Sequence, residues 1–197
     1  MINNTADKLR IALTGASGLV GSRVVELLKD DFHFISLPQE EMEITDKDQV
    51  KKTFAHLDFD LFLHLAAYTN VNKAEKEKGL CYKVNVEGTR NVFEETIKKG
   101  KSFIYISTEF VFNGTSEKMI FSEDLKPNPI GVYGTSKSEG EKIVKNKAMI
   151  VRISHPYRGE YLERKDFMRT IKDLLKQGKQ LSMITDSLIT PTFIDDI

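Results

Sequence analysis

The sequence predicts a doubly wound α/β fold, in which helices cover both faces of a sheet of parallel strands. Short apolar runs alternate with segments whose apolar residues recur at helical spacing, and the first run ends in a glycine-rich turn. Such alternation favours parallel strands joined by right-handed crossovers. The chain has 197 residues, of which 40% are hydrophobic, so it is long enough for one such domain and the beginning of a second.

The first half of the chain contains three of the expected strands. Residues 9–14 form an apolar run that is followed by glycines, which is typical of a buried parallel strand. Apolar residues recur at helical spacing from Leu19 to Leu28, and Thr45 and Asp46 offer a cap for a helix that runs to about His56. We therefore expect strands at residues 9–14, 32–37 and 60–67, separated by these two helices.

The second half continues the alternation, which loosens after residue 154. A long helical stretch reaches about Lys99, where Gly100 can end it. Residues 126–134 are rich in turn-forming residues and must form a loop. We expect strands at residues 102–107, 148–154 and 180–184, and helices at residues 135–146 and 164–176, the last one packing its Phe and Met side chains. The expected domains are residues 1–154, and a segment at 155–197 that begins a smaller domain and returns to the sheet.

Composition excludes several classes of function. The 29 basic and 29 acidic residues give no net charge, so nothing points to nucleic acid or an anionic membrane surface as a partner. The single cysteine, Cys81, excludes a disulfide framework, has no companions at metal-ligand spacing and fits a reducing compartment. The polar start and the lack of a long apolar run indicate neither a signal peptide nor a membrane span. We expect a soluble cytoplasmic protein with no metal site.

A glycine-rich turn, Thr14-Gly-Ala-Ser-Gly-Leu-Val-Gly21, lies between the first strand and the first helix. Glycines there permit a tight turn and a close approach of the backbone to a pyrophosphate. The helix N-terminus adds free N–H groups and the positive end of its dipole. Glycines at such spacing also occur in ordinary turns, but their position after the first strand of an α/β pattern favours dinucleotide binding.

A Tyr133-x-x-x-Lys137 motif follows the fourth strand and the proline-rich loop. Residues four apart share a helix face, so Lys137 would lie beside the phenol of Tyr133. A neighbouring ammonium lowers the pKa of a phenol from about 10 and suits it to acid/base work. Ser107 and Thr108 end the fourth strand at the edge where such sheets bind ligands. The motif alone is also common on helix surfaces, but its position predicts a catalytic set of Thr108, Tyr133 and Lys137.

These motifs resemble those of extended short-chain dehydrogenases/reductases, and longer segments resemble the dTDP-4-dehydrorhamnose reductases of the NAD-dependent epimerase/dehydratase superfamily. The glycine turn is similar to their T-G-x-x-G-x-x-G. Further similar segments are HLAAYTNVNKAE from His64, STEFVFNG from Ser107, PNPIGVYGTSK from Pro127 with Gly140-Glu141 after it, and TPTFIDD from Thr190. The resemblance covers nearly the whole chain in order and implies a Rossmann domain at residues 1–154 that binds NAD(P).

The resemblance also implies a reaction. NAD(P)H would deliver hydride to the ketone carbon of a nucleotide-linked keto sugar, and Tyr133 would protonate the new alkoxide. Lys137 would lower the pKa of the tyrosine and bind the nicotinamide ribose, while Thr108 would orient the carbonyl. The implied cofactor-binding residues are Gly15, Ser17, Gly18, Leu19 and Val20 at the pyrophosphate, Glu43 and Ile44 at the adenine, Leu65, Ala66, Ala67 and Tyr68 at the ribose side, and Ser107, Tyr133, Lys137, His155 and Pro156 toward the nicotinamide.

Several positions depart from the family pattern and leave the sugar open. Glu109 and Phe110 stand where these reductases have Asp and Tyr, and Asn72 and Glu43 each replace an Asp. Phe110 disfavours the related dehydratases, which use an adjacent Asp and Glu. Epimerases share the Tyr–Lys pair but usually lack the T-N-V-N-K-A-E type of segment. An epimerase and a non-catalytic dinucleotide-binding regulatory subunit, similar to the β subunit of methionine adenosyltransferase, stay as alternatives.

The residues at the end of the second strand indicate which cofactor is preferred. An acidic residue at the end of the second strand favours NAD and a basic one favours NADP. Gln39 takes the position of a basic residue in NADP-preferring relatives, so we expect NADP with NAD tolerated.

Members of this family usually continue well beyond the Asp195-Asp196 element, so we expect the sugar-nucleotide pocket to be incomplete in a chain that stops at Ile197. A homodimer is left open.

Overall fold

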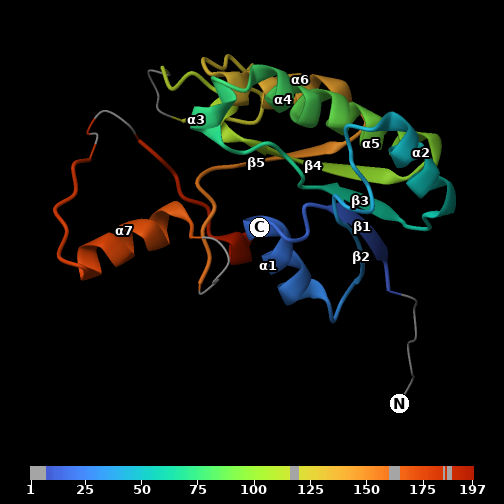
Figure 1. Cartoon of the computed structure of the whole chain (residues 1–197), viewed down its shortest axis with the longest axis horizontal. Helices are drawn as coiled ribbons and strands as arrows, with labels where there is room; N and C mark the ends of the chain where they lie inside the picture. Colours follow the sequence, from blue (N-terminus) through green and yellow to red (C-terminus); the bar gives the residue numbers. More distant parts are fainter. Residues whose placement is uncertain (1–7, 116–119, 160–164, 184, 186–187) are drawn as a thin grey trace.

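Five parallel strands form one sheet, in the order β2-β1-β3-β4-β5 (Figure 1). The computed structural model describes residues 8–115, 120–159, 165–183, 185 and 188–197. The strands are β1 Arg10–Thr14, β2 His33–Leu37, β3 Leu61–His64, β4 Ser102–Thr108 and β5 Met149–Ile153. Since every pairing is parallel, all the carboxyl ends of the strands lie at one edge. The predicted fold class is confirmed.

Helices lie on both faces of this sheet. The α1 helix, Leu19–Leu28, lies on one face (Figure 1). The opposite face carries α2 Lys47–His56, α5 Thr89–Lys98 and α6 Val132–Val144. Asp46 caps α2 as expected, because its side chain accepts hydrogen bonds from the backbone N–H groups of Asp48 and Gln49. None of the helices in the part of the chain that the structure describes is long and apolar enough to cross a lipid bilayer.

The two faces bury very different cores. Beneath α2, α5 and α6, a large apolar cluster includes Phe54, Phe62 and Phe103, each at most 2% exposed, with ring centroids 5.4–5.8 Å apart. On the α1 face, the buried members of the described cluster are Ile11, Leu13 and Leu63. The other apolar side chains of this cluster are only partly buried. The sheet is therefore well covered on one side and half covered on the other.

The long helical stretch expected to reach Lys99 is interrupted. It consists of the short helices α3 Val71–Ala74 and α4 Lys78–Tyr82, a π-helical turn at Lys83–Gly88, and α5. Such a turn inserts an extra residue and is frequent at functional sites. Gly100 follows the end of α5 with φ +66°, as expected.

Three predicted boundaries shift. The third strand ends at His64 rather than at residue 67. The proline-rich loop ends at Gly131, which caps α6, so Tyr133 lies on the helix. The last helix, α7 Phe167–Lys176, begins after Asp166, whose side chain accepts from the N–H of Arg169; residue 164 lies outside the described residues.

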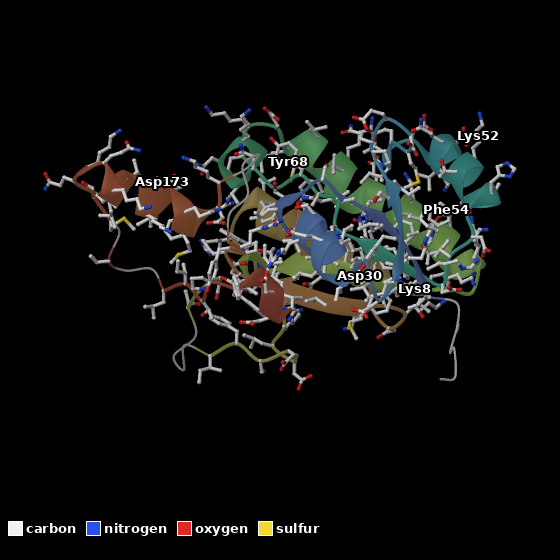
Figure 2. All side chains as sticks on the ribbon, turned by 90° about the horizontal axis from the view of Figure 1, so that it is seen from below. Lys8, Asp30, Lys52, Phe54, Tyr68 and Asp173 are labelled. Carbon is white, nitrogen blue, oxygen red and sulfur yellow. The ribbon has the colours of Figure 1, made fainter. Side chains whose placement is uncertain are left out.

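The strand expected at residues 180–184 is wrong over residues 180–183, which have no regular structure; residue 184 lies outside the described residues. A strand needs a neighbour that completes its hydrogen bonds, and β5 is the last strand of the sheet. Figures 1 and 2 show that α7, marked by Asp173, extends beyond the sheet. The packing expected of this helix is also wrong, because Phe167 and Met168 are each 40% exposed.

The end of the chain is nevertheless attached to the body. A parallel bridge joins Tyr157 to Phe193. Arg23 on α1 holds Asp195 through two hydrogen bonds of 2.7 and 2.5 Å. These contacts, together with the buried side chain of Ile194, connect the last residues to the α1 face.

Candidate active site

The residues that the sequence predicts to bind a ligand all lie at or beside the carboxyl edge of the sheet. This is the edge at which open α/β sheets bind ligands. Gly15, Ser17, Gly18, Leu19 and Val20 follow β1, Glu43 and Ile44 follow β2, Leu65, Ala66, Ala67 and Tyr68 follow β3, Ser107 and Thr108 end β4, Tyr133 and Lys137 lie in the first half of α6, and His155 and Pro156 follow β5.

The glycine turn after β1 is tightly built. Gly15 has φ +74°, and a Cβ atom there would lie 2.8 Å from the backbone nitrogen of Ala66. A Cβ atom at Gly21 would overlap the carbonyl oxygen of Gly15. Gly18 caps α1 without a side-chain hydrogen bond among the described residues. The first N–H groups of α1 follow this turn directly, and a helix N-terminus in that position can bind an anion such as a dinucleotide pyrophosphate.

A buried histidine, His64, contacts the residue that precedes the glycine turn. The imidazole of His64 lies 2.7 Å from the hydroxyl of Thr14 through Nδ1 and 3.1 Å from that of Thr89 through Nε2. Burial, with a smaller contribution from the charge of Lys137, lowers the pKa of His64 to about 3. A neutral imidazole thus ties β1, β3 and α5 together. Sequence reasoning missed this role, although a lone histidine at the end of an apolar strand was a usable signal.

Asn85, in the π-helical turn, was also missed. Its side-chain oxygen accepts from the backbone N–H of Tyr68 at 2.8 Å. Its amide nitrogen donates to the carbonyl of Tyr68 at 3.1 Å and to the hydroxyl of Ser136 at 2.9 Å. Asn85 therefore fixes the loop after β3 and the helix that presents Tyr133.

The carboxylate of Glu43 lies after β2 and is held in place. It accepts from the side chain of Gln39 at 2.6 Å and from the N–H of Thr45 at 2.9 Å. Burial acts to raise the pKa of Glu43, but these hydrogen bonds outweigh it and lower the pKa. The result is an ionised acceptor, which suits a ribose hydroxyl or an adenine amino group.

Tyr133 and Thr108 come together because α6 lies directly on the turn after β4. A Cβ atom at Gly134 would overlap the carbonyl oxygen of Phe110, so glycine permits this approach. Burial raises the pKa of the Tyr133 phenol to about 12, while hydrogen bonding to Thr108 opposes this and the charge of Glu109 adds to it. The phenol is therefore protonated at neutral pH and can serve as a proton donor.

Lys137 is directed toward the backbone of β4. Its Nζ donates to the carbonyl of Ile106 at 2.8 Å and lies 4.0 Å from the ring centroid of Tyr105. Burial lowers the pKa of Lys137 to about 7, and the charge of Glu141 opposes that shift. The expected lowering of the Tyr133 pKa is not found, because burial of the phenol dominates and the ammonium is held by Ile106.

Ser107 belongs to a buried ionic group. Its hydroxyl donates to Glu141 at 2.6 Å, and Arg152 donates to both oxygens of the same carboxylate at 2.8 and 2.7 Å. Glu141 is 5% exposed. This group places a compensated negative charge one helical turn beyond Lys137, a role that the sequence motif did not reveal.

Comparisons with known proteins identify relatives of the whole chain. Residues 9–197 match the model of a family described as "RmlD substrate binding domain". The dTDP-4-dehydrorhamnose reductases of Aggregatibacter actinomycetemcomitans and Mycolicibacterium smegmatis are 33% and 31% identical over 95% of this chain. The chain spans 64% and 58% of their respective lengths.

A solved structure gives the same relation. The dTDP-4-dehydrorhamnose reductase from Bacillus anthracis, in complex with NADP, superimposes with a TM-score of 0.89 and is 34% identical. The match covers 97% of this chain and 68% of that one. The fold is therefore shared with a reductase crystallised with NADP.

Proposed function

The chain belongs to the RmlD substrate binding domain family, and on this premise we propose that it is an NADPH-dependent reductase of a nucleotide-linked keto sugar. The substrate class is that of the named relatives, dTDP-4-dehydrorhamnose. The observation that carries the proposal is the placement of the glycine turn after β1 and of Thr108, Tyr133 and Lys137 at one edge of the sheet.

The residues divide the work of reducing a carbonyl. NADPH, when bound, supplies the hydride that adds to the carbonyl carbon. The N–H groups at the start of α1 hold the pyrophosphate. Tyr133, protonated because its pKa is about 12, gives its proton to the oxygen on which negative charge develops. Thr108 orients that oxygen, and Lys137 binds the ribose hydroxyls. The net change is addition of one hydride and one proton to form an alcohol.

We assign NADP as the preferred cofactor and NAD as an acceptable one. The Bacillus anthracis relative was crystallised with NADP. The neutral Gln39, rather than an acidic residue, follows the end of β2. Its side chain donates a hydrogen bond to the nearby carboxylate of Glu43. The carboxylate of Glu43 can accept from a 2′-hydroxyl, which keeps NAD acceptable, while the neutral side chain of Gln39 does not repel a 2′-phosphate.

We also divide the chain by role. Residues 1–154 would bind the dinucleotide, and residues 155–197 would contribute to the sugar side of the pocket. The ring of Phe167 on α7 lies 5.5 Å from that of His155, which extends the wall of the site away from the sheet.

The test measures whether the chain oxidises NADPH when dTDP-4-dehydrorhamnose, or another keto-sugar nucleotide from a panel, is present. The loss of the nicotinamide absorbance of NADPH reports the reaction. Tyr133→Phe removes the phenolic hydroxyl, and with it the proton donor, and should lower kcat about 10²–10⁴-fold. Tyr82→Phe, on α4, is the matched control. Keto-sugar-dependent oxidation of NADPH that is as fast in Tyr133→Phe as in the unchanged chain, or a folded chain that binds neither NADPH nor NADH, would refute the reductase proposal.

A further inference from the structure

Two buried side chains of α6 reach the end of β4 together. Lys137 and Glu141 are four residues apart and therefore share a face of the helix. The ammonium of Lys137 donates to the carbonyl of Ile106 at 2.8 Å, and the carboxylate of Glu141 accepts from the hydroxyl of Ser107, the next residue of β4, at 2.6 Å. A positive and a negative group are thus buried over two consecutive residues of one strand.

The carboxylate of Glu141 is fixed by a guanidinium that extends away from this helix face. Arg152 on β5 donates from Nε to Oε1 at 2.8 Å and from Nη2 to Oε2 at 2.7 Å. The same guanidinium lies 5.0 Å from the ring centroid of Phe112, and its Nη1 donates to the carbonyl of Glu123 at 3.4 Å. The positive end of this pair therefore lies toward residues that follow β4, whereas its negative end shares a helix face with Lys137.

The aromatic groups packed around Lys137 carry no charge at neutral pH. Its Nζ lies 4.0 Å from the ring centroid of Tyr105, and burial raises the pKa of that phenol above its usual value. The neutral imidazole of His64 stacks on Tyr105, with ring centroids 6.0 Å apart. Tyr133, one helical turn before Lys137, keeps its proton because its pKa is about 12. None of these three groups favours an ammonium over an amine.

Burial and one neighbouring carboxylate act on Lys137 in opposite directions. Burial lowers the pKa of Lys137 to about 7, whereas the charge of Glu141 acts to raise it. A negative charge on the thiol of Cys81, on α4, would act in the same direction as Glu141. Lys137 therefore has a charge state that its neighbours can change at neutral pH.

We propose that Glu141 is a positioning residue for Lys137: its carboxylate keeps that side chain in the ammonium form at neutral pH, and Ser107 and Arg152 hold the carboxylate where it can do so. An ammonium has three N–H donors, and an amine has two. Since the carbonyl of Ile106 takes one of them, the ammonium leaves two donors for ribose hydroxyls and the amine leaves one. This consequence rests on the proposed function, in which Lys137 binds the ribose.

Removal of the carboxylate separates this role from a structural one. Glu141→Gln keeps the shape of the side chain but leaves the charge of Arg152 without compensation. Ionisation of Lys137 should therefore move to lower pH, by about 1–2 units. Loosened packing would have the opposite effect, because water that reaches Lys137 would reduce the cost of its charge and move ionisation up toward about 10.4.

A double variant keeps the test decisive should Glu141→Gln fold poorly. Glu141→Gln with Arg152→Gln leaves no buried charge without a partner. Ionisation of Lys137 should again move to lower pH, but by less, since the member of the pair that shares its helix face is the negative one. Glu139→Gln, which removes a more exposed carboxylate of α6 that pairs with Lys142, is the matched control and should leave Lys137 unchanged.

The experiment is a pH titration by NMR of the chain labelled with ¹³C at lysine Cε. The Lys137 resonance is assigned by its loss in Lys137→Met, and circular dichroism defines the pH range in which each variant is folded. A lysine that ionises near pH 7 is separated from those with the ordinary pKa of about 10.4.

A shift of Lys137 to lower pH in Glu141→Gln and a smaller one in the double variant, with none in Glu139→Gln, support the proposal. A shift to higher pH or no shift in the folded glutamine variants overturns it, as does an equal shift in Glu139→Gln. The titration needs neither substrate nor cofactor. Failure of NADPH oxidation would therefore refute the reductase proposal and leave this result intact.

Discussion

The two faces of the sheet show how one pattern of residues leads to different degrees of burial. The face under α2, α5 and α6 is sealed by a continuous cluster of aromatic and aliphatic side chains. The face under α1 buries few residues fully, and α7, whose apolar residues also recur at helical spacing, lies away from it (Figure 1). Amphipathic periodicity therefore specifies an element, whereas its burial depends on a partner that periodicity cannot identify.

The largest effect should separate the two faces directly. Phe62→Ala, in a side chain that is 0% exposed, should lower the free energy of unfolding by about 4 kcal/mol. Phe34→Ala, on the α1 face and only partly buried, should cost about 1–2 kcal/mol, because less surface leaves water on folding. Urea denaturation measures both. Equal losses in the two variants would show that the α1 face is as well packed as the other.

A smaller effect distinguishes the ion pairs of the two faces. Glu141→Gln leaves Arg152 partly buried without its carboxylate and should cost about 3 kcal/mol. Asp195→Asn breaks the more exposed pair with Arg23 and should cost about 1 kcal/mol or less. The same denaturation experiment applies. The comparison fails if the Asp195 variant loses as much stability as the Glu141 variant.

The smallest effect concerns the pH dependence of the sealed face. The folded-state pKa of His64, about 3, lies below its usual 6.5, so the unfolded chain binds more protons between these values. The free energy of unfolding should therefore fall as the pH drops below 6.5, with His64 accounting for about 2 kcal/mol between pH 7 and pH 5. His64→Asn should flatten this slope, and His33→Asn, at an exposed position on β2, should not. Parallel slopes in all three chains would contradict a neutral, buried imidazole.

The sequence predicts the features that depend on neighbouring residues, and it does not predict those that depend on distant partners. The helix Leu19–Leu28, the Asp46 cap and the glycine turn were predictable, because they depend on residues close together in the chain. The predicted binding residues follow successive strands, so parallel topology alone brings them to one edge. These parts of the fold and the site are local in origin.

The rest depends on contacts between distant residues. Asn85 turns its amide toward Tyr68 and Ser136, 17 and 51 residues away, and the sequence does not encode that geometry locally. The direction of Lys137, toward Ile106 rather than the phenol, follows from packing of α6 on β4. The expected strand at residues 180–184 failed because an apolar run does not reveal whether a neighbouring strand is within reach.

Calorimetric titration of NADPH into the chain and two glycine variants tests the central claim most directly, that the turn after β1 holds a dinucleotide in front of Tyr133. Gly21→Ala places a methyl group against the carbonyl of Gly15, whereas Gly79→Ala, on α4, meets open space. We predict saturable binding to the unchanged chain and to Gly79→Ala, and affinity at least about tenfold weaker for folded Gly21→Ala. Equal affinity in all three proteins, or no saturable binding to the folded chain, would contradict the account.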